Sequence, residues 1–294
     1  MREIERERDR ERERERERDD FNFKIFRRNI FSQFGEDGII EEVLKRLRDV
    51  SDKQCCEFGA WDGKHLSNTY NLITNHNYEA VLIEADEKKF NELNINIPEK
   101  KIIKINKIVN FIGDNTLDNI LESTHFNKNF DFLSIDIDGC DYHIFESLSK
   151  FTPKLICIEF NPTMGKKIKF FQEKNIKIKQ GASARSIIDL GLKKNYFPIA
   201  ITACNIFFIH NKFKKIVTTL DRLNTSELLQ DLNVNYLFYD YDGNIMSGNS
   251  VLTYILNIYP FKIFNKFFIR FDRFIHEPIK YLSNLKYYLS KIFR

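Results

Sequence analysis

The sequence predicts an α/β protein built on a doubly wound, mostly parallel sheet. Seven apolar runs of strand length alternate with helical stretches, which is the pattern of a sheet with helices on both faces. The runs cover residues 54–59, 79–85, 101–106, 130–137, 154–160, 196–202 and 205–209. Only a short turn around Cys204 separates the last two runs, so they must pair antiparallel and give the sheet an antiparallel edge.

The helices between these runs follow from apolar residues at helical spacing. The clearest helix covers 37–48, where Ile39, Val43 and Leu47 lie on one apolar stripe. Further helices are predicted at 64–75, 87–94, 116–122, 141–149 and 183–194. The later segment 237–246 is typical of a hairpin, with Asp242 and Gly243 in its turn.

The two ends of the 294-residue chain differ in composition from its middle. Residues 1–20 alternate arginine with acidic residues and predict a solvated, low-complexity tail, whereas residues 21–257 hold the predicted domain. Residues 258–294 predict a helical extension with an aromatic face opposite a basic face. Such an extension suits peripheral contact with a membrane through 259–294, or a helical hairpin packed on the domain or on a second subunit of a homodimer.

The overall composition excludes several classes of protein. Hydrophobic residues make up 43% and charged residues 30% of the chain, a globular balance. The net charge of +4 is concentrated in the basic C-terminal extension, which argues against a nucleic-acid-binding protein. Five cysteines without zinc-type spacing indicate buried thiols in a reducing, cytoplasmic compartment. No secretory signal and no membrane-spanning helix are expected from the sequence.

The first two predicted strands end in residues suited to a nucleotide ligand, because parallel α/β sheets bind ligands beyond the carboxyl ends of their strands. The first strand ends in a segment that holds Glu57, Gly59 and Gly63, and the glycines would let the backbone approach a ligand with a cationic or amino-acid end. Their spacing fits neither a dinucleotide fingerprint nor a phosphate-binding loop. Glu84, at the end of the second strand, could bind both ribose hydroxyls, while Asp86 could cap the next helix.

The fourth and fifth predicted strands end in a group of oxygen-bearing side chains. One strand ends in a segment that holds Asp136, Asp138 and Asp141, and the other ends in one that holds Glu159 and Asn161. Three carboxylates at one strand end would repel each other without a cationic group among them. Asp136, Asp138, Glu159 and Asn161 could ligate Mg²⁺ or Ca²⁺, or could orient a substrate hydroxyl with a general base, and the sequence leaves both interpretations open.

Two turns add candidate ligand contacts to these strand ends. Asp114 or Asn115 could cap the helix at 116–122 and could also contact an adenine edge. The turn 31–38 holds Gln33 and Asp37 among its polar residues, and Ser32 or Asp37 could cap the first helix. This turn has more glycine and polar residues than a cap requires, so it could also close over the ligand.

Taken together, these motifs resemble a known enzyme family. EFGAWDG (57–63), IEAD (83–86) and SIDIDG (134–139) resemble the class I S-adenosylmethionine-dependent methyltransferases. FSQFGEDG (31–38), IDIDGCDY (136–142) and CIEFNP (157–162) are more narrowly similar to the FkbM-type methyltransferases. The resemblance covers about residues 30–210. It implies a Rossmann-like, seven-stranded sheet whose last strand is antiparallel.

The resemblance also implies roles for the candidate residues. The cofactor would be S-adenosylmethionine, with its methionine part near the first strand end, its ribose at the second and its adenine near the turn at 114–115. The implied cofactor contacts are Glu57, Gly59, Gly63, Glu84, Asp114, Asn115 and Asp136. The acceptor would be a sugar, polysaccharide or related hydroxyl compound. The enzyme class would be methyltransferase (EC 2.1.1).

The catalytic candidates are the groups near the transferred methyl. Asp136, Asp138 and His143 are the candidate bases, and a Mg²⁺ ion held by the oxygen ligands named above could assist them. Gln33, Asp37, Glu159 and Asn161 are candidate substrate contacts. Two alternatives remain open: a non-catalytic binding or scaffold protein on this fold, and another nucleotide-using enzyme on a Rossmann-like sheet.

Overall fold

The computed structural model describes residues 23–99, 101–219, 228–229, 237–239 and 245–247. The chain divides into two compact units, Met1–Leu232 and Asn233–Arg294. The predicted tail 1–20, the extension 258–294 and the boundary between residues 257 and 258 lie outside the described residues. Within the described ranges, no helix is long and apolar enough to cross a membrane.

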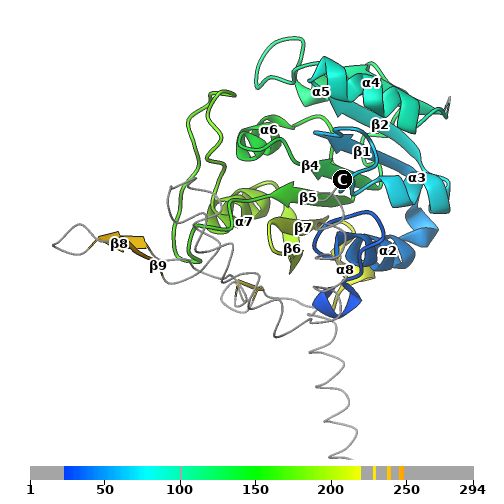
Figure 1. Ribbon diagram of the computed structural model, residues 1–294. Coiled ribbons are helices and arrows are strands. Elements are labelled where there is room, and N and C mark those ends of the chain that lie inside the picture. The colour runs from blue at the N-terminus through cyan, green and yellow to red at the C-terminus, as the bar shows by residue number, and fades with distance from the viewer. Residues whose placement is uncertain (1–22, 100, 220–227, 230–236, 240–244, 248–294) are drawn as a thin grey trace, which may run out of the picture. The chain divides into compact units, whose positions relative to one another are not determined.

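A seven-stranded sheet in the order β3-β2-β1-β4-β5-β7-β6 forms the centre of the first unit (Figure 1). The strands β1 to β5 pair parallel with their neighbours, whereas β7 pairs antiparallel with both β5 and β6. This confirms the predicted doubly wound sheet with an antiparallel last strand. The strands are β1 (Gln54–Phe58), β2 (Glu79–Glu84), β3 (Ile102–Asn106), β4 (Phe132–Ile135), β5 (Leu155–Glu159), β6 (Tyr196–Ile201) and β7 (Asn205–His210).

Helices cover both faces of the sheet because the strands bury apolar side chains on both sides. One face packs against α2 (Glu36–Arg46), α3 (Tyr70–His76) and α4 (Glu87–Asn96). The other face packs against α5 (Leu117–Glu122), α6 (Asp141–Ser147) and α7 (Ala184–Lys193). Alternation along β1 shows the division, since Cys55 packs on the α2 side and Cys56 on the α6 side. Shorter turns of helix are η1 (Phe23–Phe26), η2 (Arg48–Val50) and α8 (Lys214–Val217).

The largest difference from the predicted helices lies directly after β1. The helix predicted at 64–75 begins only at Tyr70, because residues 59–69 form a wide loop. Trp61 and Leu66 in this loop have φ of 47° and 58°, in the left-handed region that a helix cannot use. Residues of this loop line a cavity at the carboxyl end of β1.

Two predicted helix caps have different outcomes. Asp86 caps α4 as predicted, since its Oδ1 accepts a hydrogen bond from Lys89 N at 2.8 Å. The predicted cap of α5 by Asp114 or Asn115 is wrong, because Thr116 is the capping residue and its Oγ1 accepts from Asn119 N at 3.3 Å. Thr116 has the extended backbone that an N-cap needs, with φ −70° and ψ 152°.

A buried ion pair joins strands at the amino end of the sheet. Lys154 is 2% exposed, and its Nζ lies 2.7 Å from Oδ1 of the fully buried Asp131 and 3.1 Å from Oδ1 of Asp52. Asp131 also accepts a hydrogen bond from Lys53 N at 3.0 Å. The network therefore links the segments that enter β1, β4 and β5, at the end of the sheet opposite the predicted ligand contacts.

The predicted hairpin at 237–246 is confirmed by two short strands of the second unit. β8 (Leu237–Tyr239) pairs antiparallel with β9 (Ile245–Ser247). The predicted turn residues Asp242 and Gly243 lie outside the described residues.

Candidate functional site

A cavity of about 700 Å³ lies at the carboxyl ends of β1, β2, β4 and β5. Its wall includes the loop after β1, the end of β2, the turn after β4, the start of β7 and the turn 31–38 before α2. This volume is in the range of pockets that bind small molecules and cofactors. The cavity lies where a parallel α/β sheet is expected to bind its ligand.

Glu84 lines the cavity at the end of β2, as predicted. Its Oε2 accepts a hydrogen bond from Trp61 N at 2.8 Å, and its Oε1 accepts one from Asp86 N at 2.7 Å. Each carboxylate oxygen has a second lone pair, so both can still accept from a ligand. The carboxylate is thus held by backbone in one orientation, ready to accept two neighbouring hydroxyls.

Gly59 lets β1 and the segment after β4 approach each other closely. Its φ is +85°, and a Cβ on this residue would lie 1.7 Å from the carbonyl oxygen of Asp136. Only glycine tolerates both conditions. Gly59 lines the cavity as predicted, whereas Gly63 is outside the lining and would place a Cβ 2.7 Å from Ile97 Cδ1 of the α4 packing.

Glu57 lines the cavity, but the loop after β1 uses both of its oxygens. Oε1 accepts from Asn68 N at 2.7 Å, and Oε2 accepts from the hydroxyls of Ser67 and Thr69, each at 2.6 Å. Burial raises the pKa of Glu57 to about 7, because the charged form loses its hydration. Glu57, which was predicted as a cofactor contact, therefore holds the loop after β1 in its conformation.

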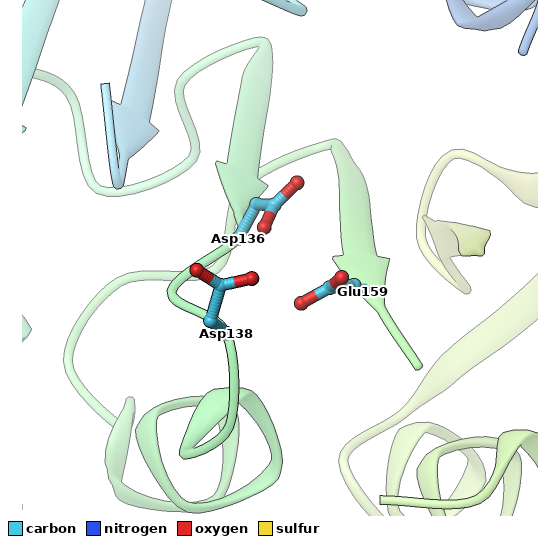
Figure 2. Close-up of side chains that lie close together, drawn as sticks. All are labelled: Asp136, Asp138 and Glu159. Carbon is cyan, nitrogen blue, oxygen red and sulfur yellow. The ribbon is translucent and has the colours of Figure 1, made fainter. Parts of the chain in front are cut away.

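Asp136, Asp138 and Glu159 come together as predicted, with a carboxylate oxygen of each within 4.8 Å of the others. Figure 2 shows the two aspartates in the segment after β4 and Glu159 at the end of β5, with their carboxyl groups around a common space. Burial, followed by the charge of Asp138, raises the pKa of Asp136. Burial and the charge of Asp136 raise the pKa of Glu159. Burial and like charge therefore favour the protonated forms of Asp136 and Glu159 on the cavity wall.

Asp141, the third carboxylate after β4, has a different role. Its two oxygens accept from the backbone of the turn, Oδ1 from Ile137 N and Oδ2 from Gly139 N, each at 2.9 Å. Burial and the charge of Asp136 raise its pKa. Asp141 thereby holds the turn that places Asp138, whose φ of 56° is uncommon for a residue with a Cβ.

The turn 31–38 reaches the cavity, as predicted, through Gln33 and Glu36. Asp37 is buried and does not line it, because its Oδ2 accepts from the backbone N–H groups of Ile30, Phe31 and Ser32 at 2.7–2.8 Å. Gly35 is the N-cap of α2. The predicted substrate contact at Asp37 is therefore a residue that holds the turn in place.

Other predicted site residues are outside the cavity lining. His143 on α6 is 3% exposed, and its Nε2 donates to the carbonyl of Gln172 at 2.6 Å, so the base role predicted for it is not supported by its position. Asn161 holds the chain after β5, accepting from Thr163 N at 2.9 Å and donating to the carbonyl of Gln180 at 2.8 Å. Asp114 and Asn115 are exposed on the turn before α5 and do not line this cavity.

The cavity also contains residues to which the sequence analysis gave no role. Trp61, Asn68, Lys179 and Asn205 all line it. So does Glu36, a 1% exposed carboxylate that was visible only as one polar residue of the turn 31–38. Asn205 opens an apolar strand, and only strand pairing brings it beside Glu159. The only local signal for a site role of Asn205 was that it is a polar residue next to the short turn between the last two strands.

Comparison with known families agrees with the motifs. Residues 112–224 match the family model described as the methyltransferase FkbM domain, which confirms the resemblance predicted from the sequence. The matched segment is less than half of the chain, and it holds the turn after β4 and the end of β5. No curated protein sequence matches the chain.

Solved structures with a similar chain trace include several methyltransferases. Monomeric WbdD matches with 13% identity and a TM-score of 0.39, over 60% of this chain and 40% of that one. A putative caffeoyl-CoA O-methyltransferase from Staphylococcus aureus matches with 14% identity and a TM-score of 0.37, over 58% of this chain and 82% of that one. The N-terminal domain of EvdMO1, crystallised with SAH and D-fucose, has 10% identity, a TM-score of 0.34 and the same coverage of 58% and 82%. The chain thus spans well under half of the length of WbdD.

Proposed function

We propose that this chain, with its FkbM methyltransferase domain, transfers the methyl group of S-adenosylmethionine to a hydroxyl oxygen. The acceptor class that we propose is a sugar, a polysaccharide or a related small molecule. The observation that carries the proposal is the arrangement of one cavity, with Glu84 oriented at one strand end and the carboxylates of Asp136, Asp138 and Glu159 at two others. The sugar part of the proposal rests on the FkbM resemblance.

The cavity suits each part of this cofactor. Glu84 offers two fixed acceptor oxygens to the neighbouring hydroxyls of a ribose. Trp61, 40% exposed in the same wall, offers an aromatic surface beside that position. The sulfonium carries a positive charge, and a cavity wall with several carboxylates attracts a cation. Gly59 lets the end of β1 pack directly against the backbone of Asp136, which holds the carboxylate wall close to the loop after β1.

The chemistry that this site must perform is an in-line displacement. The bond between sulfur and methyl breaks while a bond from the acceptor oxygen to the methyl forms, and the hydroxyl proton passes to a carboxylate of the protein. Asp138 is the first candidate for this base, because its side chain is exposed at the cavity and can meet an incoming acceptor. The predicted Mg²⁺ between the carboxylates belongs to this proposal too. Alignment of the two reactants supplies much of the rate.

The proposal is tested by calorimetric titration of the full chain with S-adenosylhomocysteine. We expect micromolar binding, and binding at least tenfold weaker in Glu84→Gln, which keeps the shape but loses the charge that strengthens both hydrogen bonds. The matched control is Glu87→Gln, an exposed glutamate three residues further on that does not line the cavity.

The same titration separates the rival functions. Binding of NAD⁺ or a UDP-sugar in place of S-adenosylhomocysteine would overturn the proposal in favour of another nucleotide-using enzyme. No binding of any of these ligands would favour a non-catalytic scaffold. Equal affinities for the wild type and Glu84→Gln would remove the ribose role of Glu84.

A further inference from the structure

Strand pairing places four positions in one row across the carboxyl ends of the sheet. Glu159 of β5 is directly opposite Asn205 of β7. Ile135 of β4 pairs with Phe58 of β1 on one side and with Ile158 of β5 on the other. One residue further along each chain, Gly59, Asp136 and Glu159 therefore lie in the same row. Paired residues of neighbouring strands project to the same face. The side chain of Asn205 therefore lies beside the carboxylates, on the face covered by α2.

Asn205 has a buried oxygen without a partner. The residue is 4% exposed, and its Oδ1 is one of four buried side-chain atoms among the described residues that make no hydrogen bond. Its Nδ2 donates to Glu36 Oε1 at 3.3 Å. Because a carboxylate oxygen accepts, this contact fixes which end of the amide is nitrogen and leaves the oxygen for another group. A buried amide oxygen without a partner costs stability unless a ligand satisfies it.

Glu36 is itself held firmly, so the amide of Asn205 has a fixed orientation. Thr202 Oγ1 donates to Glu36 Oε1 and Phe34 N donates to Glu36 Oε2, each at 2.6 Å. Both Glu36 and Asn205 line the cavity that contains the carboxylate cluster. The orphan oxygen and the carboxylates thus belong to one wall of one cavity.

We propose that Asn205 Oδ1 completes a divalent-cation site with Asp136, Asp138 and Glu159. The site deepens the proposed methyl transfer and rests on it for its biological role, but not for its chemistry. Carboxylate and amide oxygens are the ligands that Mg²⁺ and Mn²⁺ take in proteins. The proposal replaces Asn161, the amide predicted from the sequence, whose side chain is bound to Thr163 and Gln180.

The spacing of the cluster fits one ion. Oxygens on opposite sides of an ion are about 4.2 Å apart for Mg²⁺ and about 4.8 Å apart for Ca²⁺, from metal–oxygen distances of about 2.1 and 2.4 Å. The carboxylate oxygens here lie within 4.8 Å of one another, so small rotations bring them to Mg²⁺ distances. Among the residues that the structure describes, Lys179 is the cation paired with this cluster, with its Nζ 3.6 Å from Oδ2 of Asp138. Both side chains are exposed, which makes this contact weak. An arriving cation can therefore displace Lys179.

A cation at this place would act on the acceptor. Coordinated carboxylates leave ligand positions open for a hydroxyl of the acceptor, and a divalent cation lowers the pKa of a hydroxyl that it binds. Asn205 would be a ligand and not a base, since an amide takes no proton at neutral pH.

The test is titration of the full chain with Mn²⁺, followed by the loss of the EPR signal of free Mn²⁺. We expect one Mn²⁺ per chain, with affinity at least tenfold weaker in Asn205→Ala and in Asp138→Asn. The matched control is Asn161→Ala, which removes the amide predicted from the sequence and keeps every acidic residue of the chain. Its Mn²⁺ affinity should stay within twofold of the wild type.

Each outcome decides the proposal. Wild-type affinity in Asn205→Ala, or weaker binding in Asn161→Ala than in Asn205→Ala, overturns the role of Asn205. No Mn²⁺ binding by the wild type overturns the site as a whole. If Asn205→Ala does not fold, the double variant Asn205→Asp with Glu36→Gln takes its place, in which the amide nitrogen at position 36 donates to the new carboxylate. The added charge at position 205 should tighten Mn²⁺ binding, and weaker binding overturns the proposal. S-adenosylhomocysteine affinity, measured with EDTA, reports separately on the proposed function.

Discussion

Glu57 allows a direct test of the electrostatics beneath the cavity. The side chain is buried, and its pKa in the folded chain is about 7, compared with 4.5 for a free glutamate. Between these two values the folded chain keeps a proton that the unfolded chain has released. The contribution of Glu57 to the free energy of unfolding therefore falls as the pH rises from about 4.5 to 7.

The size of this effect follows from the two pKa values of Glu57. One pKa unit corresponds to about 1.4 kcal/mol, so the separation between 4.5 and about 7 is worth about 3 kcal/mol. Glu57→Gln removes the titration and keeps the shape. Its amide oxygen can still accept from Asn68 N, and the hydroxyls of Ser67 and Thr69 can rotate to accept from the amide nitrogen. Relative to wild type, we expect the variant to gain about 2.5 kcal/mol between pH 5 and pH 8, because part of the titration of the unfolded chain lies below pH 5.

The assay is urea denaturation of both proteins at pH 5, 6, 7 and 8, followed by circular dichroism. The difference between variant and wild type is dominated by Glu57, because the substitution removes only this titrating group. Glu87→Gln, an exposed change of the same kind, is the control for the substitution itself. A difference that stays constant from pH 5 to pH 8, or that changes in the opposite direction, would refute the reasoning.

Two further predictions concern buried polar residues outside the cavity lining. Lys154→Met should lower the free energy of unfolding by roughly 3–5 kcal/mol in urea denaturation, because it leaves the fully buried Asp131 without its 2.7 Å partner; a loss below about 1 kcal/mol would contradict this. Gln172→Leu removes the amide that accepts hydrogen bonds from Gln180 N and Gly181 N and donates one to the carbonyl of Ile178. Without these bonds, trypsin should cut within 172–181 at least tenfold faster. Mass spectrometry of the fragments measures this rate, and Gln180→Leu, a substitution at an exposed position, is the control.

Local pattern was enough to predict the strands of the first unit. The seven predicted runs all contain strands, because buried parallel strands need continuous apolar sequence and short lengths. The turn around Cys204 was too short for anything but an antiparallel connection. The helix predicted at 64–75 was partly wrong because Glu57, in another element, draws Ser67 and Thr69 into a loop. Such a contact leaves no trace in the spacing of the residues that it holds.

In the candidate site, the residues at strand ends were predictable from the sequence, and those on helices and loops were not. Glu84, Asp136, Asp138 and Glu159 were predictable, because each lies at the end of a strand or in the turn directly after it, and parallel strands bring their ends to one edge. His143 and Asn161 were close in sequence to these residues but bond elsewhere. Distance along the chain does not decide which way a side chain points once a helix or loop begins.

By itself, the sequence determined the sheet, the edge of the sheet that binds ligand, and the family to which residues 112–224 are matched. The tertiary structure alone decided that Glu36 and Asn205 complete the cavity wall. These two residues are 169 positions apart and meet through one hydrogen bond. Their meeting depends on the antiparallel register of β7 and on the packing of α2, which are set by the whole core and not by any local run of residues.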